Sequence, residues 1–117
     1  MIKYAIRLYN NEKDAHLIFH STPDQTHYIW QWYITDDKDS IGKVIEGEDM
    51  QSFITTTDLI KENNYDGLFL YCSYRNRNTQ EQFKTELIPL YADVNKIIES
   101  GTVFDDISTY DKTGEII

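Results

Sequence analysis

Two groups of carboxylates are the residues of this chain whose type and spacing could do chemistry. The chain has 20 acidic and 11 basic residues among 117, a formal net charge of −9, and the segments 36–66 and 99–117 carry the whole excess. Carboxylates spaced like the phosphates of a nucleic acid can occupy the basic channel of an enzyme that binds one. The candidate partner-binding residues are Asp36, Asp37, Asp39, Glu46, Glu48 and Asp49 in the first group and Asp105 and Asp106 in the second. We expect the two groups to form one negative face if the tail folds beside the loop at 36–49.

A short basic patch, Arg75-Asn76-Arg77-Asn78-Thr79, is a second candidate site, for a small anion or a nucleotide. It lies between an expected buried strand and an expected helix start at Thr79. Backbone N–H groups at a helix N-terminus, together with the guanidinium groups of Arg75 and Arg77, can hold a phosphate or a carboxylate. The alternative is a polar loop whose arginines pair with the protein's own acids, and the patch lacks the spacing of a Gly-rich phosphate loop.

Two further patterns resemble metal sites, but each lacks a ligand. His16 and His20 would lie on the same face of a strand, yet Ile18 lies between them and no cysteine or carboxylate stands at ligand spacing within that strand. Residues 37–48 partly match a calcium-binding loop, but Ile41 occupies a position that needs an oxygen ligand. We therefore expect no metal and no cofactor.

The sequence contains no recognisable set of catalytic residues. A Gly-x-Ser-x-Gly motif is absent, and Cys72, the only cysteine, lies in the apolar run 68–72, where a cysteine usually behaves as a small buried hydrophobic residue. Asp105 and Asp106 are adjacent, so on a strand they would point to opposite faces and would not share a proton. We therefore expect that the protein is not an enzyme.

Length and composition predict a single folded domain over residues 1–117. Hydrophobic residues make up 40% of the chain and aromatic residues 14%, and a chain of this length buries enough surface to fold without disulfides or metal. The sequence shows neither a secretory signal nor an apolar run of ~18 residues, which favours a cytoplasmic location. The acidic surface disfavours direct binding to nucleic acids or to anionic membranes.

Alternation of apolar and polar residues predicts an N-terminal meander of strands. Residues 2–9 alternate in this way and form, with 15–21, an expected hairpin across a polar turn. Residues 28–35 are almost wholly strand-favouring and are the expected third strand, although the Thr-Pro pair at 22–23 also fits the start of a helix through this segment. The remaining expected strands are 41–45 and 68–74.

Two helices are expected in the second half of the chain. Apolar residues at helical spacing, including Met50 and Ile54, predict a helix over 48–63. A capping signal followed by an apolar stripe predicts a second helix over 80–100, which Pro89 should kink or split. The expected fold class is α+β: a mostly antiparallel sheet with an N-terminal meander, two helices packed on one face, and a C-terminal hairpin or extended tail over 107–117.

In size and composition, the chain resembles the inhibitors that phages and other mobile elements make against nucleases, and the immunity proteins that neutralise bacterial toxins. The likeness extends to no motif, so no functional residue is carried over. This likeness and the clustered acidic residues together favour an inhibitor or immunity-type protein, which docks an acidic face onto a basic protein such as a nuclease or another nucleic-acid-binding enzyme.

The alternatives are a protein that sequesters an anion or nucleotide through Arg75, Arg77 and Thr79, and a structural or assembly subunit. The sequence leaves the oligomeric state open.

Overall fold

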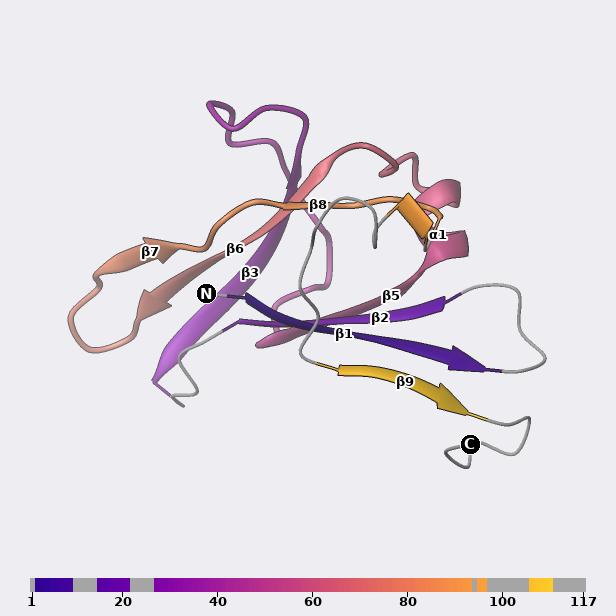
Figure 1. Ribbon diagram of the computed structural model, residues 1–117. Coiled ribbons are helices and arrows are strands. Elements are labelled where there is room, and N and C mark those ends of the chain that lie inside the picture. Colours follow the sequence, from indigo (N-terminus) through magenta and orange to yellow (C-terminus); the bar gives the residue numbers. More distant parts are fainter. Residues whose placement is uncertain (1, 10–14, 22–26, 94, 97–105, 111–117) are drawn as a thin grey trace.

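The computed structural model contains two β-sheets and, in the part of the chain that it describes, one short α-helix (Figure 1). It describes residues 2–9, 15–21, 27–93, 95–96 and 106–110, with the backbone alone for 3–9, 15 and 106–110. The elements are β1 (Ile2–Tyr9), β2 (Ala15–Ser21), β3 (Tyr28–Thr35), β4 (Lys43–Val44), β5 (Ser52–Thr56), α1 (Thr57–Glu62), β6 (Phe69–Asn76), β7 (Gln82–Lys84), β8 (Ile88–Pro89) and β9 (Asp106–Tyr110). No helix among these residues has the length and apolar character needed to cross a membrane.

The first sheet has the strand order β5-β2-β1-β9. β1 and β2 pair antiparallel, which confirms the predicted hairpin. β5 pairs antiparallel with the other side of β2, whereas β9 pairs in parallel with β1. Leu17, Phe19 and Phe53 are buried on the inner face of this sheet. The turn and second arm of the predicted C-terminal hairpin, residues 111–117, lie outside the described residues.

The second sheet has the order β4-β3-β6-β7, and β8 also pairs with β6. The predicted strands at 28–35 and 68–74 are confirmed as β3 and β6, which pair antiparallel along their whole length. The expectation of a three-stranded meander is wrong, because β3 pairs with β4 and β6 rather than with β2. Trp30, Trp32 and Ile34 face inward from β3, so the core lies between the two sheets.

The helix predicted over 48–63 is wrong, because this segment is a strand followed by a six-residue helix. Phe53 and Thr55 are buried while Ile54, between them, is exposed, which is the alternation of a strand. β-Branched residues lose rotamer freedom in a helix and suit a pleated, half-buried surface. The helix α1 begins only after Thr56, whose hydroxyl accepts a hydrogen bond from the N–H of Leu59 at 3.1 Å.

The helix predicted over 80–100 is wrong over residues 82–89, which run beside β6 as β7 and β8. Residues 94 and 97–100 of this prediction lie outside the described residues. Pro89 neither kinks nor splits a helix. It lies on the edge strand β8, where its missing N–H costs the sheet no hydrogen bond. The expected α+β fold with two helices on one face is thus wrong: the described residues form a mostly antiparallel two-sheet fold with one short helix.

A β-bulge separates β7 from β8 and ties the two sheets together. The pairing registers on its two sides differ by one residue, so one extra residue stands in this edge strand. The hydroxyl of Thr85 accepts a hydrogen bond from the N–H of Cys72, and the backbone N–H of Thr85 donates to the carbonyl of Cys72. Both distances are 2.9 Å. The carboxylate of Glu86, next to Thr85, accepts a hydrogen bond from the N–H of Ile2 in the first sheet.

Trp32 joins the two sheets at the opposite side of the core. Its side chain is fully buried, and its ring lies 5.9 Å from that of Phe53, centroid to centroid. The indole N–H donates to the carbonyl of Met50 at 2.8 Å. The backbone carbonyl of Trp32 accepts a hydrogen bond from the N–H of Ile45, and the backbone N–H of Trp32 donates to the carbonyl of Glu48. The chain between β4 and β5 therefore passes from one sheet to the other along Trp32.

We predict that Trp32→Phe lowers the free energy of unfolding by about 1–3 kcal/mol, because it removes the hydrogen bond to Met50 and opens a cavity. Trp30→Phe is the matched control. Trp30 is also buried, but its indole makes no hydrogen bond to a described residue. Urea denaturation of both variants measures the difference. Equal losses in the two variants would show that the hydrogen bond adds nothing.

Candidate functional site

The loop between β3 and β4 presents three of the predicted carboxylates. Asp36, Asp37 and Asp39 are all exposed. The hydroxyl of Thr35 donates to the carbonyl of Asp37 at 2.8 Å, and the carboxylate of Asp37 accepts from the N–H of Asp39 at 2.9 Å. The loop is therefore shaped by its own hydrogen bonds, and its charges face solvent at one end of the second sheet.

The segment between β4 and β5 presents the other three carboxylates of the first group. Glu46 and Asp49 are exposed, and Glu48 is half-buried. The side-chain amide of Gln31, on β3, donates to three backbone carbonyls at 3.1–3.2 Å, and one of them belongs to Glu48. This amide holds the segment against β3, so the first acidic group lies along the β4 side of the second sheet.

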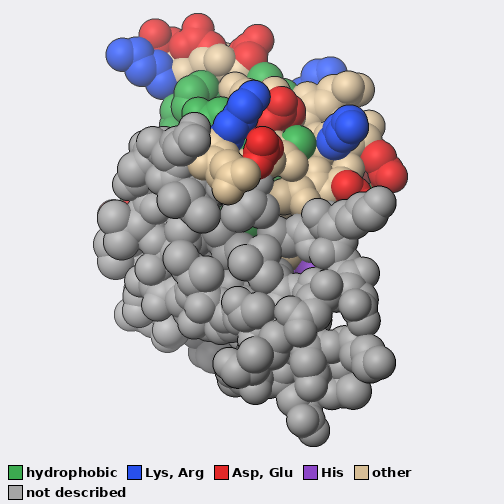
Figure 2. Space-filling view, turned by 45° about the vertical axis from the view of Figure 1, so that its right-hand side comes forward, with side chains coloured by type: hydrophobic (Ala, Val, Ile, Leu, Met, Phe, Trp, Pro, Cys, Tyr) green, Lys and Arg blue, Asp and Glu red, His purple; other side chains and the backbone are tan. Residues whose placement is uncertain are grey.

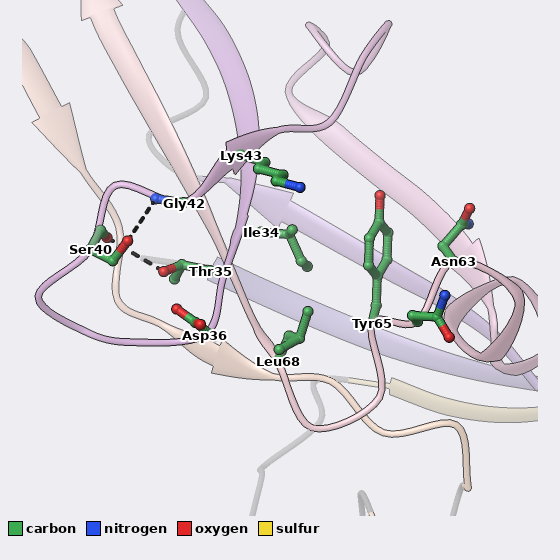
Figure 3. A pocket seen from close by; sticks show the side chains of 10 residues that line it. Ile34, Thr35, Asp36, Ser40, Gly42, Lys43, Asn63, Tyr65 and Leu68 are labelled. Carbon is green, nitrogen blue, oxygen red and sulfur yellow. Dashed lines mark hydrogen bonds between the residues drawn. The ribbon is translucent and has the colours of Figure 1, made fainter.

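A groove runs between β4 and α1 beside these acids. Its first hollow, of about 630 Å³, has Ile34 and Leu68 among its lining, and Figure 3 shows the ring of Tyr65 standing beside these two side chains. A second hollow, of about 370 Å³, is lined by β4, β5 and α1. Tyr65 and Asn63 line both hollows, so the two adjoin. Among the described residues that line the two hollows, Lys43 is the only cation.

Large apolar side chains are exposed in this part of the chain, and three of them, Val44, Ile54 and Leu59, line the second hollow. Five of them are between 41 and 76% exposed, and all lie between residues 41 and 59: Ile41, Val44, Met50, Ile54 and Leu59. Figure 2 shows Asp and Glu side chains on the described surface, with exposed hydrophobic side chains and Lys or Arg side chains among them. Contiguous exposed apolar side chains with a polar rim are typical of a protein interface.

The second acidic group does not join the first where the structure describes it. β9, which carries Asp106, is the edge strand of the first sheet, on the side opposite β5. Three strand spacings, about 14 Å, separate the backbones of these two edges. Asp105 lies outside the described residues. Of the two groups, the first is therefore the one that the described residues place beside the groove.

The basic patch lies in a β-hairpin, and the helix expected after it does not form. Arg75 is on β6, and Arg77 and Thr79 are in the turn to β7. The side chain of Asn76 accepts hydrogen bonds from the N–H of Thr79 and its neighbour, which closes the turn. The guanidinium of Arg75 donates to the side-chain carbonyl of Gln80, so it pairs with an amide rather than with one of the protein's acids.

The histidines and the calcium-like loop show no coordination geometry. His20 Nδ1 lies 2.7 Å from the hydroxyl of Ser52 on β5, and His27 stacks on Tyr28. Within the described ranges, no three His, Cys, Asp or Glu side chains come close enough to hold a metal ion.

The sequence identified the acids of this site but missed its apolar part. Helical spacing placed Met50 and Ile54 on the buried stripe of a helix, whereas both are exposed. The run of β-branched residues over 54–57 was the signal that could have corrected this. No protein-family model matches the chain, and neither a curated protein nor a solved structure matches it.

Gly42 fixes the shape of the acidic loop, and we predict that Gly42→Ala destabilises the protein by about 2 kcal/mol or more. Its φ is +74°, and a Cβ would lie 2.1 Å from the carbonyl oxygen of Ile34. Gly47 is the matched control, because its φ is +80° but a Cβ there would meet nothing within 4 Å. Gly47→Ala should therefore cost only the positive-φ penalty of about 1 kcal/mol. Thermal unfolding compares the two, and similar losses would contradict the clash.

Cys72 should make stability fall at alkaline pH. Burial raises the pKa of its thiol from 9.0 to about 11. The folded state therefore disfavours the thiolate, so stability is unaffected below about pH 9 and declines as pH rises from 9 to 11. Burial also raises the pKa of Tyr71 and Tyr74, so these tyrosines add a decline that both proteins share. We predict that the decline between pH 9 and 10 is smaller in Cys72→Ala, because this variant lacks the contribution of the thiol. Urea denaturation at several pH values measures it, and an identical slope in both proteins would refute the assignment.

Proposed function

We propose that this chain is a small acidic binding protein, of the inhibitor or immunity type, that docks the surface 36–59 onto a basic surface of a nucleic-acid-processing enzyme. The single observation that supports it is the mixture of exposed apolar side chains and carboxylates on one surface. An acidic surface that served solubility alone would keep Met50 and Ile54 inside. Here these side chains are 67 and 60% exposed.

The two kinds of residue have separate roles in this proposal. Carboxylates such as Asp37, Asp39 and Glu46 attract a basic partner at long range and raise the association rate. Apolar side chains such as Leu59 supply affinity once they are desolvated at the centre of an interface. The aromatic ring of Tyr65, between the two hollows, is a rigid anchor of the kind that interfaces favour.

The proposal includes no catalytic step and no cofactor, and its partner would be met in the cytoplasm. Cys72 is buried and does not line either hollow of the groove. A structural or assembly subunit is the alternative use of the same apolar surface. Light scattering separates the two uses, because self-assembly predicts oligomers of the chain alone and inhibition predicts a monomer that binds a different protein.

We predict that Glu46→Lys and Leu59→Ser each weaken binding at least about tenfold, because one reverses a charge in the groove and the other removes an apolar contact. The partner is first captured from a lysate and purified, and its Kd is then measured at low and high salt. Binding to the unchanged chain should weaken steeply with salt.

Matched controls carry the same changes on other surfaces. Glu81→Lys shifts the net charge equally in the exposed turn before β7, and Ile29→Ser removes an apolar side chain that is 39% exposed, against 43% for Leu59. Both controls should bind within about twofold of the unchanged chain. Equal losses in the variants and their controls would contradict the assigned surface, as would a partner without a basic face.

A further inference from the structure

The outer face of the second sheet has the opposite chemistry to the groove. Two of its side chains are cations and none is a carboxylate, although the whole chain has a net charge of −9. The registers of β3, β6 and β7 place on this face Ile29, Gln31, Tyr33, Tyr71, Ser73, Arg75, Gln82 and Lys84. The nearest acid of the bulge, Glu86, turns instead toward Ile2 of the first sheet.

A stack of three side chains forms the centre of this face. The rings of Tyr33 and Tyr71 are parallel within 4°, with centroids 5.0 Å apart. The ammonium of Lys84 lies 4.3 Å from the centroid of the Tyr71 ring, a distance typical of a cation–π contact. The hydroxyl of Tyr71 donates to the carbonyl of Ile41 at 2.6 Å. The aromatic surface is thus held in place from three strands and a loop.

Two adjoining hollows open on either side of Tyr33. The larger, of about 450 Å³, has Lys84 in its wall, and the smaller, of about 100 Å³, has Arg75. Tyr33, Ser73 and Gln82 line both. None of the described residues that line these hollows is an acid. The larger is of the size of ordinary small-molecule sites, about 300–1,000 Å³.

The two cations lie on the same face of neighbouring strands, with the ammonium of Lys84 over the ring of Tyr71 and the guanidinium of Arg75 donating to the side chain of Gln80. Ser73 pairs with Lys84, and Arg75 pairs with Gln82, so the cations are diagonal neighbours on β6 and β7. Diagonal neighbours on one face lie about 7–8 Å apart at the backbone, within reach of long side chains. The amide of Gln82 donates to the hydroxyl of Ser73 at 2.9 Å, which leaves that hydroxyl a proton to donate to a ligand.

We propose that this face binds a nucleoside monophosphate, with the phosphate between Lys84 and Arg75 and the base against Tyr33. Charge-assisted hydrogen bonds hold the phosphate, and aromatic contact with the base adds affinity. A nucleic acid strand is disfavoured, because it would extend past Ile41 to the carboxylates of the acidic loop. This site is separate from the groove and does not depend on the proposed protein partner.

The test is a titration of the full chain with adenosine 5′-monophosphate, followed by amide NMR shifts and calorimetry, with adenosine and inorganic phosphate as separate probes. The expected result is saturable binding whose shifts cluster on β3, β6 and β7. Adenosine and inorganic phosphate should each bind at least about tenfold more weakly, because each lacks one half of the contacts.

Lys84→Gln and Arg75→Gln should each weaken the binding of adenosine monophosphate about tenfold, while Lys61→Gln, on the exposed side of α1, should leave it unchanged. Two variants are used because Lys84 also packs on Tyr71, and the amide spectrum of each reports whether it is folded. Absence of saturable binding to the unchanged chain would overturn the proposal. So would shifts centred on the groove, an equal loss in Lys61→Gln, or equal affinity for any one of the partial probes.

Discussion

The burial of Trp32 is the constraint on which the rest of the structure depends. A buried tryptophan needs an acceptor for its indole N–H, and the carbonyl of Met50, 2.8 Å away, provides it. This hydrogen bond fixes the segment that runs from β4, in the second sheet, to β5, in the first. Because of this crossing, Val44 on β4 and Ile54 on β5 line the same hollow as Leu59 on α1.

The second sheet separates two surfaces of opposite character. Successive side chains of a strand point to opposite faces, so β3 sends Trp30, Trp32 and Ile34 into the core and Tyr33 to the outer face. The outer face gathers Arg75 and Lys84, while the acids gather along the β4 side. The positive and negative segments of the sequence thus lie on separate surfaces of the described structure.

Local patterns predicted the strands well and the helices badly. Residues 2–9 and 15–21 have polar and apolar faces of a strand, and no helical spacing competes with that pattern. In 48–63, helical spacing of Met50 and Ile54 competed with strand-favouring threonines, and the contact of Phe53 with Trp32 decided for the strand. The candidate site was also predicted only in part. The acids of 36–49 were recognised from their charge, whereas the apolar side chains were expected to be buried in the core and are exposed.

The sequence by itself determined the charge balance, the aromatic core, the first hairpin and the presence of an acidic surface, because these depend on residue types and on close neighbours. The tertiary structure decided which strands share a sheet, that α1 is short, and that Asp106 lies away from the acids of 36–49. The pairs of β2 with β5 and of β3 with β6 join residues more than thirty positions apart. These strand pairs are stabilised only when Trp32, Phe53 and their neighbours are buried together. The free energy of this burial cannot be predicted from local sequence patterns.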